Sequence, residues 1–108
     1  MNNVFIGIGN LAGKGAYANY DFKKGEVVIK YNLQPITKME YDELPEREKE
    51  FTHSFKGQIF LYSEPERFVN HSEIPNTYSD HILKADIALR DIKKGELITC
   101  DNTKDDVE

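Results

Sequence analysis

The sequence contains only one cysteine, Cys100, among its 108 residues. A single thiol cannot form an internal disulfide and cannot by itself build a structural zinc site, so we expect packing alone to hold the domain together. Long apolar runs are also lacking, since the longest is far below the roughly 20 residues that cross a bilayer. The N-terminus has no basic segment followed by an apolar one. We therefore expect an intracellular, cytoplasmic protein without a membrane partner; a nuclear location stays open if the source is eukaryotic.

Basic residues are outnumbered, because 14 Lys and Arg face 19 Asp and Glu and give a net charge of −5. A negatively charged domain repels phosphate backbones, which argues against direct nucleic-acid binding and favours a basic peptide as partner. The chain has room for one core, since domains of about 100 to 150 residues are the commonest. Hydrophobic residues make up 39% of the chain and charged residues 31%, the balance of a folded globular protein. We expect a single domain over residues 1–108.

The most informative regularity is a near-repeat, in which the segment 18–28 returns as the segment 88–98. Both copies place Asp and then Lys-Lys-Gly-Glu between apolar residues of high β propensity. Glycine supplies the positive φ of a tight turn, so each copy predicts a strand, a turn and a strand. Two copies are too few for a solenoid. They predict two similar ribbons within one mostly β domain.

Local signals predict further elements between the two copies. Thr37 and Glu40 have the spacing of a capping box, which predicts a short helix that Pro45 interrupts before a second helical turn. Strands are expected at residues 4–9, 58–62 and 86–89, and a permissive glycine loop at 13–18. The insert around the helix is acidic, and it either forms a solvated face or attracts a basic peptide. The carboxylates that could attract such a peptide are Asp42, Glu43, Glu46, Glu48 and Glu50.

Three separated segments carry the functional signal: Gly13–Ala18, Arg67–Asn76 and Ala88–Asp101. Taken alone, Asn70 and His71 before a serine and a proline are more often a hydrogen-bonded turn than a ligand site. Together, however, the three segments resemble the SET-domain protein lysine methyltransferases in order and spacing. The middle one is similar to the family's R-F-I-N-H-S-C-x-P-N box, and the last to its A-x-R-D-I-x-x-G-E-E-L-T-x-D-Y segment. The resemblance implies a mostly β SET fold of several small curved sheets, with short helices, a threaded C-terminal segment and no post-SET segment.

The same resemblance implies an S-adenosylmethionine-dependent protein lysine N-methyltransferase. The partner would be a lysine-bearing protein or peptide. In the family the residue matching Asn70 offers its side-chain amide to the amino-acid head of the cofactor, and the residue matching His71 uses backbone groups toward adenine. The cofactor-binding residues implied for this chain are Gly13, Lys14, Gly15, Tyr17, Arg67, Asn70 and His71. Tyr17 could instead belong to the core, and Lys14 could simply be solvated.

The implied catalytic residues are Tyr31 and Asn102. Tyr31 resembles the tyrosine that lines the lysine channel in the family, although an aromatic residue at a strand end is also ordinary packing. Asn102 stands where the family has its catalytic tyrosine, so this position has an amide and no ring. The tail 103–108 has no aromatic residue to close the channel, which a partner or a second subunit of a homodimer could do. The alternative to a weak or partner-dependent enzyme is a catalytically impaired SET-fold interaction module.

Overall fold

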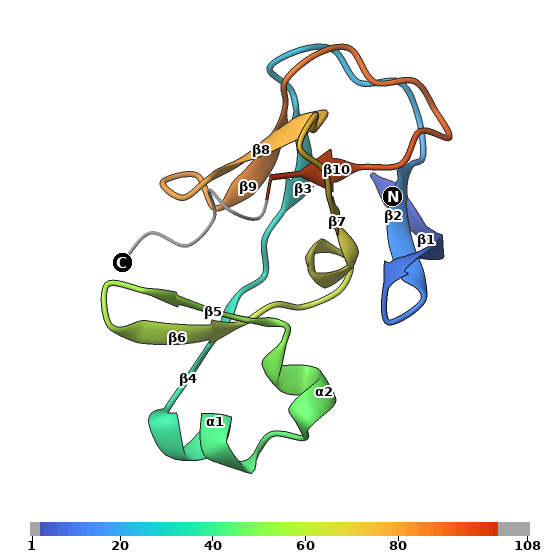
Figure 1. Ribbon diagram of the computed structural model, residues 1–108. Coiled ribbons are helices and arrows are strands. Elements are labelled where there is room, and N and C mark those ends of the chain that lie inside the picture. Colours follow the sequence, from blue (N-terminus) through green and yellow to red (C-terminus); the bar gives the residue numbers. More distant parts are fainter. Residues whose placement is uncertain (1–2, 102–108) are drawn as a thin grey trace.

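The computed structural model describes residues 3–101 and is built mainly from short strands (Figure 1). They form four small sheets rather than one large one, as the expected SET architecture requires. The strands are β1 (Val4–Leu11), β2 (Lys14–Ala18), β3 (Val27–Lys30), β4 (Gln34–Ile36), β5 (Thr52–Phe55), β6 (Gln58–Leu61), β7 (Asn70–His71), β8 (Thr77–Asp80), β9 (Ala85–Ala88) and β10 (Thr99–Cys100). The helical elements are α1 (Lys38–Glu43), α2 (Glu46–Lys49) and the 3-10 turn η1 (Glu66–Phe68). The prediction of a mostly β fold is confirmed.

The pairing of the strands brings distant parts of the chain together. Strands β1 and β2 form an antiparallel hairpin, and the order β3-β9-β8 makes a sheet whose central strand comes late in the sequence. The order β4-β6-β5 makes a separate sheet beside the helices. Strand β10 pairs in parallel with β7, so the C-terminal segment lies directly against the Asn-His segment. This last pairing places two of the three functional segments side by side.

The two copies of the near-repeat are partners of each other. Phe22 and Ile92 form a bridge in which each backbone N–H donates to the other's carbonyl, at 2.7 and 2.8 Å. Gly25 and Gly95 hold φ values of 90° and 91°, and each donates a 2.8 Å hydrogen bond to the first residue of the other copy. Figure 1 shows the two segments side by side at the top of the view. The predicted similarity is confirmed, although a single bridge, not a regular strand, precedes each turn.

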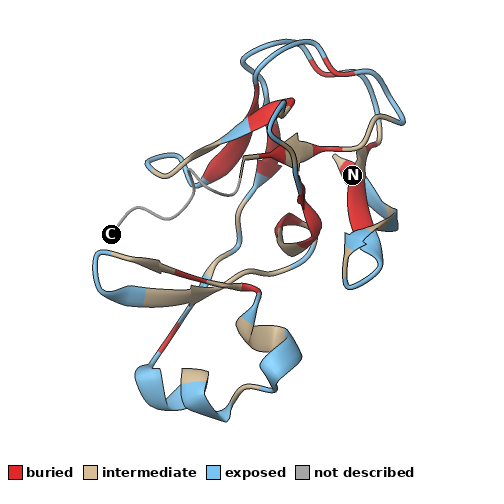
Figure 2. Cartoon of the chain, viewed as in Figure 1, coloured by how far each residue is buried: buried red, intermediate tan, exposed pale blue. Residues whose placement is uncertain are grey.

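The hydrophobic core lies between these paired segments and the hairpin (Figure 2). Val28, Ile92 and Ile98 are at most 1% exposed. Burying one such side chain contributes about 1.5–3 kcal/mol to stability. Cys100 is also buried in this cluster.

The short helices lie at the surface of the molecule. The capping box at the start of α1 is confirmed, because the Thr37 hydroxyl accepts from the Glu40 N–H at 3.1 Å and the Glu40 carboxylate accepts from the Thr37 N–H at 2.9 Å. Pro45 separates α1 from α2, and neither helix has a buried residue. Between residues 3 and 101, none of the helices has the length and apolarity needed to span a membrane.

The expected glycine loop at Gly13–Ala18 is largely a strand instead. Only Ala12 and Gly13, with φ values of 55° and 79°, form the turn, and the residues from Lys14 onward pair with β1. The two backbones approach closely at Gly9 of β1, where an added Cβ would lie 2.3 Å from the carbonyl oxygen of Lys14. Within the segment itself, a Cβ at Gly15 would lie 2.9 Å from the Leu97 side chain and 3.4 Å from the side-chain amide nitrogen of Asn70.

Candidate functional site

Asn70 connects the hairpin to the turn η1. Its side chain is 2% exposed, and its Oδ1 accepts a 2.8 Å hydrogen bond from the N–H of Asn10. Its Nδ2 donates to the carbonyls of Lys14 and Phe68 at 3.1 and 2.9 Å. Both amide hydrogens are therefore occupied by backbone, and only Oδ1 keeps acceptor capacity. The Asn70 side chain could accept from a ligand ammonium, but it has no hydrogen left for a ligand carboxylate.

The three functional segments meet around Asn70. Thr99 and Cys100 of β10 lie opposite Asn70 and His71 in the parallel pair. The hairpin contacts the C-terminal segment, because the N–H of Ile98 donates a 2.8 Å hydrogen bond to the carbonyl of Ala16 in β2. The glycine-rich, Asn-His and C-terminal segments therefore lie together. Asn102 lies outside the described residues.

The other implied cofactor residues surround this junction in different ways. Gly13 is at the exposed hairpin turn, where an added Cβ would meet no atom of another described residue within 4 Å, its chain neighbours aside. The Lys14 ammonium lies 5.1 Å from the centre of the Phe68 ring, which is a cation–π contact. Tyr17 is half-buried and stacks on the exposed Phe5 with ring centroids 5.5 Å apart, outside the core cluster. Gly15 is buried and pairs with β1 within the hairpin.

His71 and Arg67 complete the implied set. His71 is exposed, and its Nδ1 lies 3.9 Å from a carboxylate oxygen of Asp101. The Arg67 guanidinium donates to the carbonyl of Tyr62 at 3.0 and 2.8 Å and to both carboxylate oxygens of Glu48 at 3.2 Å. It also lies 4.7 Å from the centre of the Phe51 ring. Arg67 therefore ties η1 to the acidic helix α2, and its own charge is already paired.

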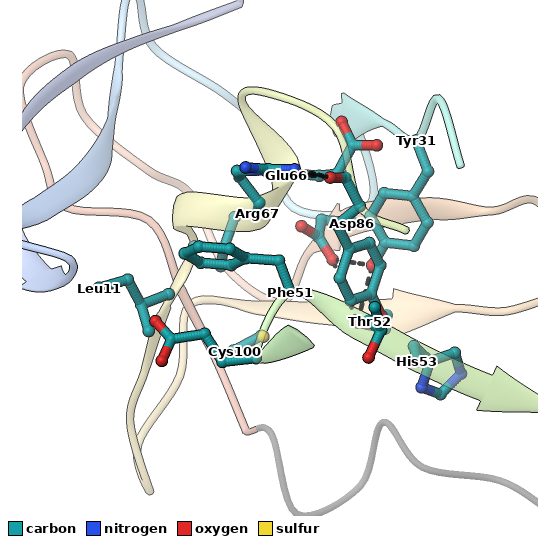
Figure 3. Close-up of a pocket in the computed structure, with 13 residues that line it drawn as sticks. Leu11, Tyr31, Phe51, Thr52, His53, Glu66, Arg67, Asp86 and Cys100 are labelled. Atoms are coloured by element: carbon teal, nitrogen blue, oxygen red, sulfur yellow. Dashed lines mark hydrogen bonds between the residues drawn. The ribbon is translucent and has the colours of Figure 1, made fainter. Parts of the chain in front are cut away.

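A cavity of about 200 Å³ lies beside this junction (Figure 3). Residues from β1, β5, η1, β8, β9 and β10 contribute to its wall, and Tyr31 joins them from the segment just after β3. Most of the polar and aromatic side chains in its wall are rings or carboxylates. They include Tyr31, Phe51, Tyr62, Glu66 and Asp86, beside the guanidinium of Arg67. Pockets for whole drug-sized ligands are usually about 300–1,000 Å³. This cavity suits a side chain or a single functional group better than a complete cofactor.

Tyr31 lines the cavity. Its phenol donates to Asp86 and lies 2.8 Å from the Ser79 hydroxyl oxygen (Figure 3). Burial, followed by the negative charge of Asp86, raises the pKa of the Tyr31 phenol well above its usual range. The phenol is therefore neutral at physiological pH. Tyr31 also packs against the core cluster, which is the ordinary packing role that the sequence left open.

Two buried carboxylates in the cavity wall were missed by the sequence reasoning. Asp86 is 2% exposed in the central strand β9, and Glu66 is 6% exposed in η1. A charged residue within the otherwise apolar segment Ala85–Ala88 was a signal for the first. Glu66 gave no signal, because it stands in the polar run Ser63–Arg67, which is typical of an exposed turn.

Comparison with known proteins agrees with this architecture. The family model described as SET domain matches residues 13–102. A crystal structure of a Plasmodium falciparum protein described as a candidate histone methyltransferase is similar, with a TM-score of 0.72 and 22% sequence identity over 94% of this chain and 93% of that one. At this identity the likeness concerns the fold. None of the curated proteins compared matches the chain. The family match covers most of the sequence and all three functional segments, and the chain therefore belongs to the SET-domain family.

Proposed function

We propose that the protein binds S-adenosylmethionine and transfers its methyl group to a lysine side chain of another protein. The observation that carries this proposal is the junction at Asn70, where the hairpin, the Asn-His segment and β10 meet beside the cavity that Tyr31 lines. The net charge of −5 suits a basic peptide substrate. We further propose a cytoplasmic location. The second subunit of a homodimer could close the lysine channel, because the tail 103–108 contains no aromatic residue to do so.

The residues present fit such a cofactor chemically. The cofactor has a sulfonium and an ammonium group, and both are cations. The free acceptor capacity of the Asn70 oxygen suits the ammonium, and the aromatic and acidic cavity wall suits positive charge. Since the cavity is too small for the whole cofactor, we assign its nucleoside to the surface formed by the hairpin and β7. Gly13, Lys14, Gly15, Tyr17, Arg67, Asn70 and His71 remain the residues proposed to hold it.

The bound cofactor would supply an electrophilic methyl group. In the transfer a nitrogen–carbon bond forms as the sulfur–carbon bond breaks, so the lysine amine must be neutral and held in line about 3 Å from the methyl carbon. The rings of Tyr31, Phe51 and Tyr62 would keep water away from the amine. The neutral Tyr31 phenol would contribute a fixed dipole without adding charge. No covalent step on the protein is needed.

Cofactor binding and methyl transfer test this proposal directly. We expect saturable binding of S-adenosylmethionine in a calorimetric titration, because the three segments that the family uses for it lie together. We also expect radiolabelled methyl groups to be incorporated into lysine when the protein is incubated with mixed histones or cell lysate. Heat-denatured protein is the control for chemical methylation. A titration without measurable heat at any temperature tried, together with no protection of the protein against thermal unfolding, would contradict the proposal.

A catalytically impaired interaction module is the second candidate function. It is favoured by the substitution of Asn102 for the catalytic tyrosine and by the exposed acidic surface of α1 and α2, which have no buried residue. Such a surface could dock a basic partner while the cofactor site persists. Binding of the cofactor without any methyl transfer would favour this second function over the first.

Asn102→Tyr separates the two functions. We expect this variant to increase methyl transfer about tenfold or more, because a positioned phenol can orient the amine and exclude water from it. The rate of radiolabel incorporation is the measurement. Thr103→Tyr is the matched control, since it adds the same ring one residue later in the chain. Equal rates for the two variants would show that Asn102 does not correspond to the family tyrosine.

A further inference from the structure

Glu66 has a buried carboxylate oxygen without a partner. The residue is 6% exposed, and its Oε2 accepts from the N–H groups of Asn32 and Ser63 at 2.7 and 3.3 Å. Its Oε1 is buried and has no hydrogen-bond donor among the described residues. Leaving a buried polar atom unpaired costs about 1–3 kcal/mol, and more when the group is charged. Such an atom in a cavity wall points to a ligand that supplies the missing donor.

The guanidinium of the adjacent residue, Arg67, does not supply this donor. Arg67 follows Glu66 in η1 and lines the same cavity, but its guanidinium is engaged by Glu48 and by the carbonyl of Tyr62. The Tyr31 phenol donates to Asp86 rather than to Glu66. Figure 3 shows Glu66 beside Tyr31 and Asp86 in the cavity wall. Glu66 therefore lines the cavity together with a second buried carboxylate and several rings, and its Oε1 is an acceptor without a donor among the described residues.

The size and chemistry of that space define the ligand group. A cavity of about 200 Å³ is below the usual range for a whole ligand and admits a narrow chain. Aromatic rings with a carboxylate form a receptor for organic cations, because the ring faces and the carboxylate both attract positive charge. A primary ammonium also supplies three hydrogen-bond donors, which suits a site rich in oxygen acceptors.

We propose that Glu66 is the receptor for a primary ammonium group at the end of an unbranched alkyl chain. The identification of that group with the side chain of a substrate lysine rests on the proposed function, whereas the ammonium site itself does not. Glu66 is thus a specificity-determining residue: it selects a charged amine over a neutral chain of the same shape. None of the three sequence motifs includes it, since Arg67 begins the Asn-His box.

Ammonium binding at Glu66 is compatible with methyl transfer. An ammonium that donates a hydrogen bond to Oε1 can pass that proton to the same oxygen. The products are a neutral amine, with its lone pair restored, and a neutral carboxylic acid. A neutral pair is favoured over two charges in a space that water leaves, so the step is assisted by desolvation.

Binding of n-butylammonium, with 1-butanol as the neutral probe, tests the site. We expect the natural protein to bind n-butylammonium at least tenfold more tightly than 1-butanol in an NMR titration that follows amide shifts of η1 and β9. In Glu66→Gln this preference is expected to fall to about twofold or less. The glutamine oxygen can still accept from Asn32 and Ser63, so the fold is retained. Glu43→Gln is the matched control, since Glu43 is exposed on α1 and its loss changes the net charge equally.

Stability measurements separate a binding role from a structural one. If Glu66 serves binding, its unpaired buried charge destabilises the free protein. The melting temperature of Glu66→Gln should then be equal to or above that of the natural protein. A lower melting temperature with an unchanged preference for n-butylammonium would overturn the proposal. So would equal binding of the two probes by the natural protein.

Calorimetry with S-adenosylmethionine on the same samples keeps the two proposals apart. Cofactor binding without a preference for n-butylammonium would overturn the Glu66 site and leave the proposed function standing. A preference that depends on Glu66, without cofactor binding, would support the site and contradict the proposed function.

Discussion

Replacing Asn70 by alanine is expected to lower the free energy of unfolding by about 2–4 kcal/mol. The substitution leaves the N–H of Asn10 and the carbonyls of Lys14 and Phe68 without their partner, and the last of these bonds is fully buried. It also releases the hairpin from η1, so we expect cofactor binding to weaken in parallel. Chemical denaturation followed by circular dichroism measures the first effect, and calorimetry the second.

Asn10→Ala is the matched control for this experiment. The Asn10 side chain is exposed, and only its backbone N–H contacts Asn70, so the hydrogen bond survives the substitution. We expect a change below about 0.5 kcal/mol, as for ordinary surface substitutions. Asn70→Asp keeps the oxygen that accepts from Asn10, but it replaces the donor Nδ2 by a second oxygen. This oxygen would be repelled by the carbonyls of Lys14 and Phe68, so the variant should be at least as destabilising as alanine. If all three variants were equally stable, Asn70 would not connect the hairpin to η1.

The parts of the fold that could be predicted are those written in local patterns. The capping box of Thr37 and Glu40 needs only residues three apart, and the turn at Gly25 needs only one residue that tolerates positive φ. The near-repeat correctly predicted two similar segments with the same glycine turn, although the strand expected before each turn is only an isolated bridge. That the copies pair with each other, through Phe22 and Ile92, is a long-range contact that neither copy encodes alone.

The candidate site shows the same division. The meeting of the three functional segments was expected only because they resemble a family in which they meet, since a two-residue parallel pair such as β7 with β10 has no periodicity to detect. The ion pair of Arg67 with Glu48 depends on where α2 packs, which the sequence motif does not specify. The burial of Glu66 likewise depends on hydrogen bonds from the backbone N–H groups of Asn32 and Ser63. Asn32 is far from Glu66 in the sequence, so no local pattern reveals its contact.

Replacing Gly9 by alanine is expected to lower the free energy of unfolding by about 3 kcal/mol. A Cβ at this position would lie 2.3 Å from the carbonyl oxygen of Lys14 and 2.6 Å from the backbone nitrogen of Gly15. Both are backbone atoms, so the clash cannot be relieved by a side-chain rotation, and overpacking of this kind costs about 1–3 kcal/mol or more. The hairpin strands must separate. Chemical denaturation and hydrogen exchange of the amides in β2 are the measurements.

Gly13→Ala in the same hairpin distinguishes crowding from backbone strain. Gly13 has φ of 79°, but an added Cβ would meet nothing within 4 Å among the described residues beyond its chain neighbours, so its substitution carries only the cost of a left-handed conformation, about 1–2 kcal/mol. We therefore expect Gly9→Ala to be the more damaging and to raise exchange along β2, whereas Gly13→Ala affects the turn alone. Because Asn10 follows Gly9 and donates to Asn70, separation of the strands at Gly9 should also weaken cofactor binding. Equal losses in the two variants would mean that the hairpin tolerates a wider spacing, and the close approach of its backbones would then not be what positions the glycine-rich segment against Asn70.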